Sequence, residues 1–217
     1  MFKNSLATVI KHLINLGMLI SGRGSNMDAI LAAIKSGRIT NAKPCIVISN
    51  EPEAAGLKIA SEKCGLPTKV VPSQGLKGWN YDQNLVTILH EHGVTSQSGL
   101  VCLAGFMRIM SSEFVRLYRM RIMNIHPALL PAFPGLHAQK QAIDYGVKVS
   151  GCTVHFVDEG VDSGPVILQM AVPVLEEDDE ASLSARILEQ EHQLYPEAVS
   201  MFCQGRIKVE GRRVSIV

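Results

Sequence analysis

Short runs of apolar residues alternate with amphipathic segments along most of the chain. The runs are rich in Val, Ile and Leu, which is typical of parallel strands buried on both faces. They predict strands at residues 13–20, 43–49, 67–72, 99–105 and 121–125. Between them, apolar residues recur at helical spacing and predict helices after Asn26 and at residues 54–64, 78–92 and 111–119. This alternation indicates a parallel sheet with right-handed crossovers and helices on both faces.

The C-terminal third of the chain follows a different pattern. After a short helix come two β-rich runs, close enough together to form antiparallel additions to the sheet. An acidic run then precedes a long helix, where its charges favour the helix dipole, and a β-like tail follows. In chain order these segments are residues 138–145, 149–157, 165–174, 176–180, 181–204 and 206–217.

The predicted fold class is therefore α/β, with three layers in a Rossmann-like arrangement. Its sheet is mostly parallel and twisted, with antiparallel strands added near the C-terminus. The pattern contains no repeat and no interdomain linker, so we expect a single domain at residues 13–217. Residues 1–12, with a weak helical pattern, read as an extension in front of it.

One stretch, Met123 to His137, is the point around which the chain is organised. A short apolar strand ends with the polar residues Asn124 and His126. Three prolines and a glycine follow within ten residues, so neither a helix nor a strand can continue. The sequence thus predicts an amide and an imidazole held at the end of a rigid strand, beneath a stiff loop.

A second feature is the glycine-containing turn SGRGSN, Ser21 to Asn26, between the first strand and the first helix. This arrangement presents free backbone N–H groups to an anion, with Ser25 or Asn26 as the helix N-cap and Arg23 as an added charge. The turn lacks the third glycine of a dinucleotide fingerprint. From the residues alone, a phosphate site and an ordinary tight turn both remain open.

The strand end, the FMRIM turn at residues 106–110 and the loop with Asp158 and Asp162 should meet at the carboxyl edge of the sheet. An Asn can donate hydrogen bonds to an oxyanion, a His can relay a proton, and an Asp beside the His would stabilise its cation. Together they suit transfer of an acyl-like group between nitrogen atoms. No activated Ser or Cys nucleophile is evident.

Less specific interpretations of these residues also stand. His126 before a proline is compatible with an ordinary loop residue, and Asp162 with a simple turn. We expect His137 and His155 to be structural or surface residues. Arg108 could cap a strand end as well as bind a ligand.

Composition narrows the class of protein. Hydrophobic residues make up 47% of the chain and aromatic residues 5%, and the net charge of +1 gives no basic footprint for nucleic acid or an anionic membrane. The five cysteines are scattered, without C-x-x-C, which favours a reduced, cytoplasmic protein. No metal cluster is evident, and His90 and His92, two residues apart, do not share a helix face.

Several long blocks resemble the phosphoribosylglycinamide formyltransferase family in order and spacing. They are SGRGSN, VISNEPEAAGL, LAGFMRIM, NIHPALLPAFPGLH, GCTVHFVDEGVDSGPVILQ and EQEHQLYP. The resemblance runs from about Leu19 to Arg206 and implies the family's three-layer formyltransferase fold. It also implies transfer of the formyl group of 10-formyltetrahydrofolate to the amine of 5'-phosphoribosylglycinamide in de novo purine synthesis. The partners would be these small molecules, without metal, in a monomer or homodimer.

The resemblance assigns roles residue by residue. His126 matches the catalytic proton donor, Asp162 the carboxylate that favours its protonated form, and Asn124 a residue shared with the folate site. The phosphate of the nucleotide would contact Gly24, Ser25 and Asn26, and Glu191 would contact the same substrate. The folate pocket would be lined by Met107, Arg108, Ile109 and Met110, and closed by the loop that begins at Asp158.

One departure concerns the folate site. The family often carries an arginine where this chain has Gly78, with Lys77 beside it, so either Lys77 substitutes or the contact is missing. The rivals are three. A methionyl-tRNA formyltransferase would need a further tRNA-binding domain and more basic charge. A formyltetrahydrofolate deformylase would use water as acceptor and should lack SGRGSN, and a non-catalytic nucleotide-binding module would bind phosphate there with His126 structural.

Overall fold

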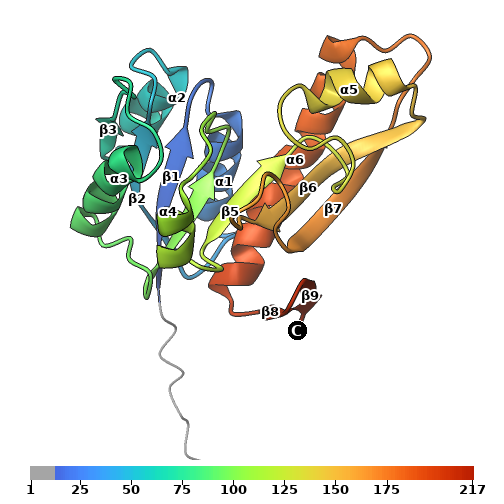
Figure 1. The fold of residues 1–217 in the computed structure, drawn as a ribbon. Helices are drawn as coiled ribbons and strands as arrows, with labels where there is room; N and C mark the ends of the chain where they lie inside the picture. The colour runs from blue at the N-terminus through green and yellow to red at the C-terminus, as the bar shows by residue number, and fades with distance from the viewer. Residues whose placement is uncertain (1–12) are drawn as a thin grey trace, which may run out of the picture.

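The computed structural model describes residues 13–217, and a seven-stranded sheet forms its centre (Figure 1). The helical pattern expected within residues 1–12 lies outside the described residues. The strands are β1 (Ile14–Ile20), β2 (Ala42–Ser49), β3 (Thr68–Val70), β4 (Gly99–Leu103), β5 (Ile122–His126), β6 (Val149–Phe156) and β7 (Val166–Pro173). Their order is β3-β2-β1-β4-β5-β6-β7, with β1 to β5 parallel and β6 and β7 antiparallel. The predicted mixed sheet is thus confirmed.

The helices also form where the apolar spacing predicted them. They are α1 (Ser25–Lys35), α2 (Ala55–Lys58), α3 (Trp79–Glu91), α4 (Ser112–Leu117), α5 (Ala138–Tyr145) and α6 (Glu180–Cys203). The segment predicted as one helix at residues 54–64 is divided, because α2 passes into a π-helical turn, η1 (Ile59–Lys63). Such turns widen the helix locally and leave it short.

Helices cover both faces of the sheet, as Figure 1 shows for α1 and α6 behind it and α3 and α4 in front. On one face Met27 and Leu183 pack with β-strand residues into one core cluster. On the other face Tyr81 and Phe114 belong to a second cluster. Because the parallel strands are buried on both sides, they read as uninterrupted apolar runs in the sequence.

The chain order reverses at β1, which lies between β2 and β4. In open α/β sheets a ligand crevice forms at the carboxyl ends of the strands on either side of such a reversal. The SGRGSN turn leaves the end of β1, and Gly105 follows the end of β4. The Ser21 N–H donates to the Gly105 carbonyl at 2.9 Å, which joins the two strand ends.

The acidic run before α6 has the structural role expected of it. Asp179 forms a capping box with Ser182, and Asp178 accepts from the Arg186 guanidinium at 2.6 and 2.8 Å. The capping box satisfies the backbone N–H groups of Asp179 and Ser182, and the ion pair holds Arg186 over the start of the helix. The β-like tail forms a separate two-stranded hairpin, β8 (Ile207–Glu210) with β9 (Arg213–Ile216).

Candidate active site

The end of β5 presents Asn124 and His126 on one face, because alternate residues of a strand point the same way. His126 is only 4% exposed. Its Nε2 donates to the Phe133 carbonyl at 2.8 Å, and its Nδ1 lies 3.2 Å from Asp162 Oδ2. Both ring nitrogens therefore lie beside oxygen atoms, which fix the orientation of the imidazole from two sides.

Asp162 reaches His126 from the connection between β6 and β7. Its backbone has a φ of +49°, in the left-handed region that Asp tolerates better than most residues. The carboxylate oxygen that faces His126 also accepts the Gly135 N–H at 2.8 Å. Asp162 thereby links the proline-rich loop after β5 to the loop between β6 and β7, which the sequence predicted to lie beside it.

His155 is the site residue that sequence reasoning missed. It was expected to be structural or at the surface, but the β5–β6 pairing sets it directly opposite Asn124, where it is 2% exposed. Its Nε2 lies 3.2 Å from Asn124 Nδ2 and 3.7 Å from Asp162 Oδ1. Burial lowers the pKa of His155 below its ordinary value, with hydrogen bonding to Phe156 and the charge of Asp162 opposing that effect.

The loop after β5 is anchored beneath by a buried hydroxyl. Thr153 Oγ1 donates to the Ala128 carbonyl at 2.7 Å and accepts the Leu130 N–H at 3.1 Å. The Gln169 amide binds both Thr153 and the Leu130 carbonyl at 2.9 Å. This network satisfies loop backbone groups that would otherwise be buried without partners, and it holds the loop over the strand end.

The SGRGSN turn has a backbone that only glycine fits. Gly24 has a φ of +71°, and a Cβ on it would lie 2.8 Å from the Gly56 Cα. The predicted N-cap was wrong: Ser25 is the first residue of α1, and Gly24 takes the cap position without a side-chain bond. Because no side chain occupies that place, the first N–H groups of α1 stay available to an anion. Arg23, exposed between two glycines, adds a positive charge there.

Glu191 lies beside this turn although it is 165 residues distant from Asn26 in sequence. The Asn26 side-chain N–H donates to Glu191 Oε2 at 2.7 Å, and both residues are buried. Burial raises the pKa of Glu191, while the bond from Asn26 acts in the opposite direction. The remaining Asn26 oxygen is buried without a partner, so a ligand donor could bind it.

A cavity of about 700 Å³ connects these features. Its lining runs from Gly24 and Glu191 past Gly105 to Pro127, the residue that follows His126. The structure therefore brings the predicted phosphate turn and the predicted catalytic strand end to one hollow, as the carboxyl edge of a parallel sheet would.

The FMRIM turn divides into exposed and buried parts. Met107 and Ile109 are 68% and 77% exposed, an unusual exposure for apolar side chains, and Met107 lines the cavity. Met110 is buried in the core. The Arg108 guanidinium stacks on the Tyr81 ring, 3.7 Å from its centroid. It also donates to Ser73 and, at 2.9 Å, to the Leu76 carbonyl. Arg108 thus fixes the loop before α3, where Lys77 is exposed.

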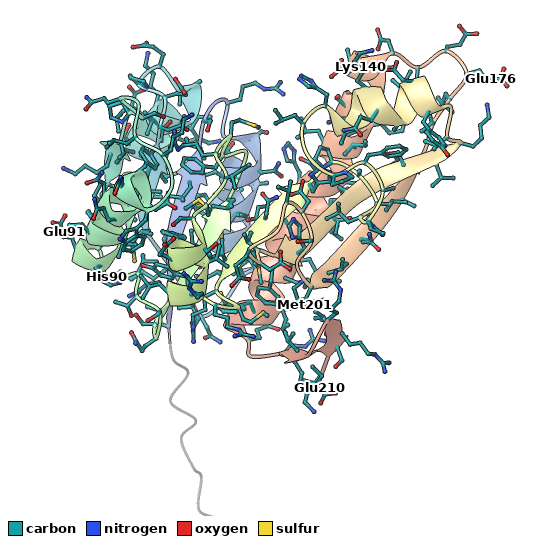
Figure 2. The ribbon with its side chains drawn as sticks, viewed as in Figure 1. His90, Glu91, Lys140, Glu176, Met201 and Glu210 are labelled. Atoms are coloured by element: carbon teal, nitrogen blue, oxygen red, sulfur yellow. The ribbon has the colours of Figure 1, made fainter. Side chains whose placement is uncertain are left out.

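The other predicted residues have clear positions. Asp158 accepts from Ser163 Oγ at 2.6 Å and from the Gly160 N–H at 3.1 Å, so it shapes the loop that carries Asp162. His137 is exposed, with its Nδ1 3.8 Å from Glu180. Figure 2 shows His90 and Glu91 at the outer end of α3, and His90 is exposed as expected.

Residues 13–217 lack two features. No group of three or more His, Cys, Asp or Glu side chains there is arranged to hold a metal ion. No helix in that part of the chain combines the length and the apolar character needed to cross a bilayer.

Known proteins share this architecture. The phosphoribosylglycinamide formyltransferase of Escherichia coli (strain K12) is 42% identical over 196 residues, covering 90% of each chain. The solved glycinamide ribonucleotide transformylase 1 from Symbiobacterium toebii is 48% identical with a TM-score of 0.89, over 95% of each chain. The trifunctional purine biosynthetic protein adenosine-3 of Drosophila melanogaster is 46% identical, but this chain spans only 15% of its length.

A further likeness concerns the fold alone. The structure of a formyltetrahydrofolate deformylase from Pseudomonas syringae superposes with a TM-score of 0.84 at 24% identity. The family model described as formyl transferase matches residues 14–199, which include β1, the strand end of β5, the Asp162 loop and most of α6. With its parallel sheet, its Asn-x-His strand end and this match, the chain belongs to the formyl transferase family.

Proposed function

We propose that this protein transfers the formyl group of 10-formyltetrahydrofolate to the amine of 5'-phosphoribosylglycinamide, a step of de novo purine synthesis. The observation that carries the proposal is one cavity that joins the anion-binding turn to Ile125 and Pro127, the two residues that flank His126 of the Asn-His-Asp cluster. The names of the relatives from Escherichia coli and Symbiobacterium toebii support the same formyl acceptor.

The nucleotide would bind at the α1 end of the cavity. Its phosphate would accept hydrogen bonds from the backbone N–H groups of Gly24, Ser25 and Asn26, with Arg23 beside them. Glu191, held by Asn26, is placed to accept from a hydroxyl or amine of the substrate. These contacts would hold the reacting amine toward β5, so that attack becomes effectively unimolecular.

The folate would lie against the exposed apolar side chains of the FMRIM turn. Met107 and Ile109 offer contact area to a flat ring, and Arg108 keeps the neighbouring loop in place. The loop that Asp158 shapes through its bond from Ser163 would cover the ring. We assign Met110, which is buried, to support of the turn rather than to contact.

The amine nitrogen attacks the formyl carbon, and the C–N bond to the folate then breaks. As negative charge grows on the formyl oxygen, the Asn124 amide and His126 Nε2–H donate to it, with the oxygen replacing the Phe133 carbonyl. Asp162 balances the imidazolium charge. The amine proton passes to the leaving nitrogen through His126, Asp162 or water, so no metal takes part.

We further propose a single domain at residues 13–217, acting as a monomer or homodimer on small molecules rather than nucleic acid or membrane. The five cysteines are all free, which suits a reducing, cytoplasmic setting. Residues 1–12 have no assigned role.

A direct assay tests the proposal. The purified chain receives 10-formyltetrahydrofolate with and without 5'-phosphoribosylglycinamide, and both formylated product and free tetrahydrofolate are measured. Formylation that depends on the nucleotide supports the proposal, whereas equal turnover in water alone identifies a deformylase. His126→Ala should abolish transfer while nucleotide binding persists; retained turnover would contradict its role, and binding without turnover in the unaltered chain would identify a non-catalytic module.

A further inference from the structure

His155 lies beside Asn124 and Asp162 without a role in the reaction described above. It does not belong to the Asn-x-His motif, and it comes from an antiparallel strand rather than from the parallel core. Nearly complete burial of an imidazole requires that both ring nitrogens find partners. The identity of those partners fixes its protonation.

Its Nδ1 lies 2.9 Å from the Phe156 carbonyl oxygen. A carbonyl oxygen only accepts, so Nδ1 carries the hydrogen. In a neutral ring Nε2 then holds a lone pair, and it lies 3.2 Å from Asn124 Nδ2, which donates to it. One hydrogen of the Asn124 amide is committed to His155, and this turns the NH₂ group, rather than the carbonyl, toward the cluster.

We propose that neutral His155 is a positioning residue, which orients the Asn124 amide so that its NH₂ group faces the oxyanion. This role rests on the proposed formyl transfer, since Asn124 needs a donor orientation only if an oxyanion forms. An Asn side chain is nearly symmetric in shape, so packing alone would hardly distinguish its two orientations. An acceptor on one side of the amide makes the distinction.

Protonation of His155 would remove the acceptor. Nε2–H would then repel the Asn124 NH₂ group and favour the flipped amide, and it would approach Asp162 Oδ1, now 3.7 Å distant. The negative charge of Asp162 would then be shared between two cations, so it would stabilise the positive charge of His126 less well. Three titratable groups face His155. They are His126 on β5, and Asp158 and Asp162 on the loop between β6 and β7. Burial keeps the pKa of His155 below 6.5, which preserves the neutral form near pH 7.

Two isosteric substitutions separate the two ring nitrogens. His155→Gln can place an amide oxygen where Nε2 accepts, whereas His155→Asn can reproduce only the donor at Nδ1. We expect kcat of His155→Gln to stay within about threefold of the unaltered enzyme and that of His155→Asn to fall about 10- to 100-fold, with the KM for the nucleotide unchanged in both. Equal losses in the two variants, or a loss confined to KM, would overturn the proposal.

The pH profile gives a readout that a merely structural role would not change. His155→Gln removes one ionisation, so its kcat should decline less steeply toward acidic pH than that of the unaltered enzyme. An identical acidic limb would contradict the proposal.

A spectroscopic measurement keeps the inference separate from the proposed function. The ¹⁵N shifts of the His155 ring in the unaltered protein, assigned by their loss in His155→Gln, should show hydrogen on Nδ1 and a lone pair on Nε2 at pH 7. Hydrogen on Nε2 at that pH would refute the orientation of Asn124 even in an active enzyme. An inactive chain with the expected tautomer would instead contradict the proposed formyl transfer.

Discussion

The two ends of the cavity are built differently. At the nucleotide end, one contiguous turn provides glycine backbone and a helix N-terminus, and α6 brings Glu191 to it from a distant part of the sequence. At the formyl-transfer end, three separate segments supply His126, His155 and Asp162. The first end therefore depends on local backbone conformation, and the second on strand register and loop placement. Substitutions at the two ends should therefore impair different steps, substrate binding at the first end and formyl transfer at the second.

After the loss of transfer expected of His126→Ala, the largest effect is expected from Asp162→Asn. The amide cannot balance the imidazolium of His126, although it can still accept the Gly135 N–H. We expect kcat to fall about 100- to 1000-fold, with little change in the KM for the nucleotide, in steady-state assays. Glu159→Gln, in the same loop but exposed, should leave kcat unchanged. A loss that appears mainly in KM would show that the two ends are not separable.

Gly24→Ala should impair binding at the nucleotide end of the cavity. The methyl group would meet the Gly56 Cα at 2.8 Å, and the left-handed backbone would be strained by roughly 1–2 kcal/mol. We expect the KM for the nucleotide to rise about 10- to 100-fold, because the N–H groups that face the phosphate shift. Thermal unfolding of Gly22→Ala, whose methyl meets no atom within 4 Å, serves as the folding control. Unchanged nucleotide binding in Gly24→Ala would place the phosphate elsewhere.

Glu191→Gln tests the nucleotide end through the pH dependence of protein stability. Burial raises the pKa of Glu191, so the folded protein binds its proton more tightly than the unfolded chain does. Above the pKa of the folded state, the ionised carboxylate therefore destabilises the fold. Below the ordinary pKa of 4.5 the group is protonated in both states, so this loss of stability disappears. The variant should have a higher Tm at pH 7 and an unchanged Tm near pH 4.

The same variant should weaken nucleotide binding about tenfold, since a charged acceptor is lost. Glu189→Gln, exposed on the same helix, is the matched control for both measurements. A Tm at pH 7 equal to that of the unaltered chain would mean that Glu191 is accommodated without cost.

The smallest effect is expected from Lys77→Ala. Lys77 is exposed beside the position where the family often has an arginine, and an exposed ion pair with folate would contribute little. We expect the KM for 10-formyltetrahydrofolate to rise about two- to fivefold. Lys69→Ala, exposed on β3, should leave it unchanged. Equal KM values in both variants would mean that this contact is absent.

Much of the fold could be predicted because its rules are local. Apolar runs buried on both faces indicated the five parallel strands, and helical spacing indicated the helices between them. The π-helical turn after α2 could not be predicted, because no residue pattern in that segment distinguishes it from an α-helix. The capping of α1 was misread for a related reason: Ser25 is a good cap by type, but Gly24 alone tolerates the left-handed backbone.

The site residues likewise divide into those that the sequence predicts and those that only the tertiary structure identifies. The sequence by itself determined the glycine turn and the Asn-x-His strand end, because each is a short contiguous run whose geometry follows from backbone chemistry. Only the tertiary structure decided that His155 faces Asn124, since strand pairing turns a residue inward or outward with a shift of one position. The bond between Asn26 and Glu191 likewise required α6 to pack against α1. Contacts between distant segments depend on register and packing, which no local pattern specifies.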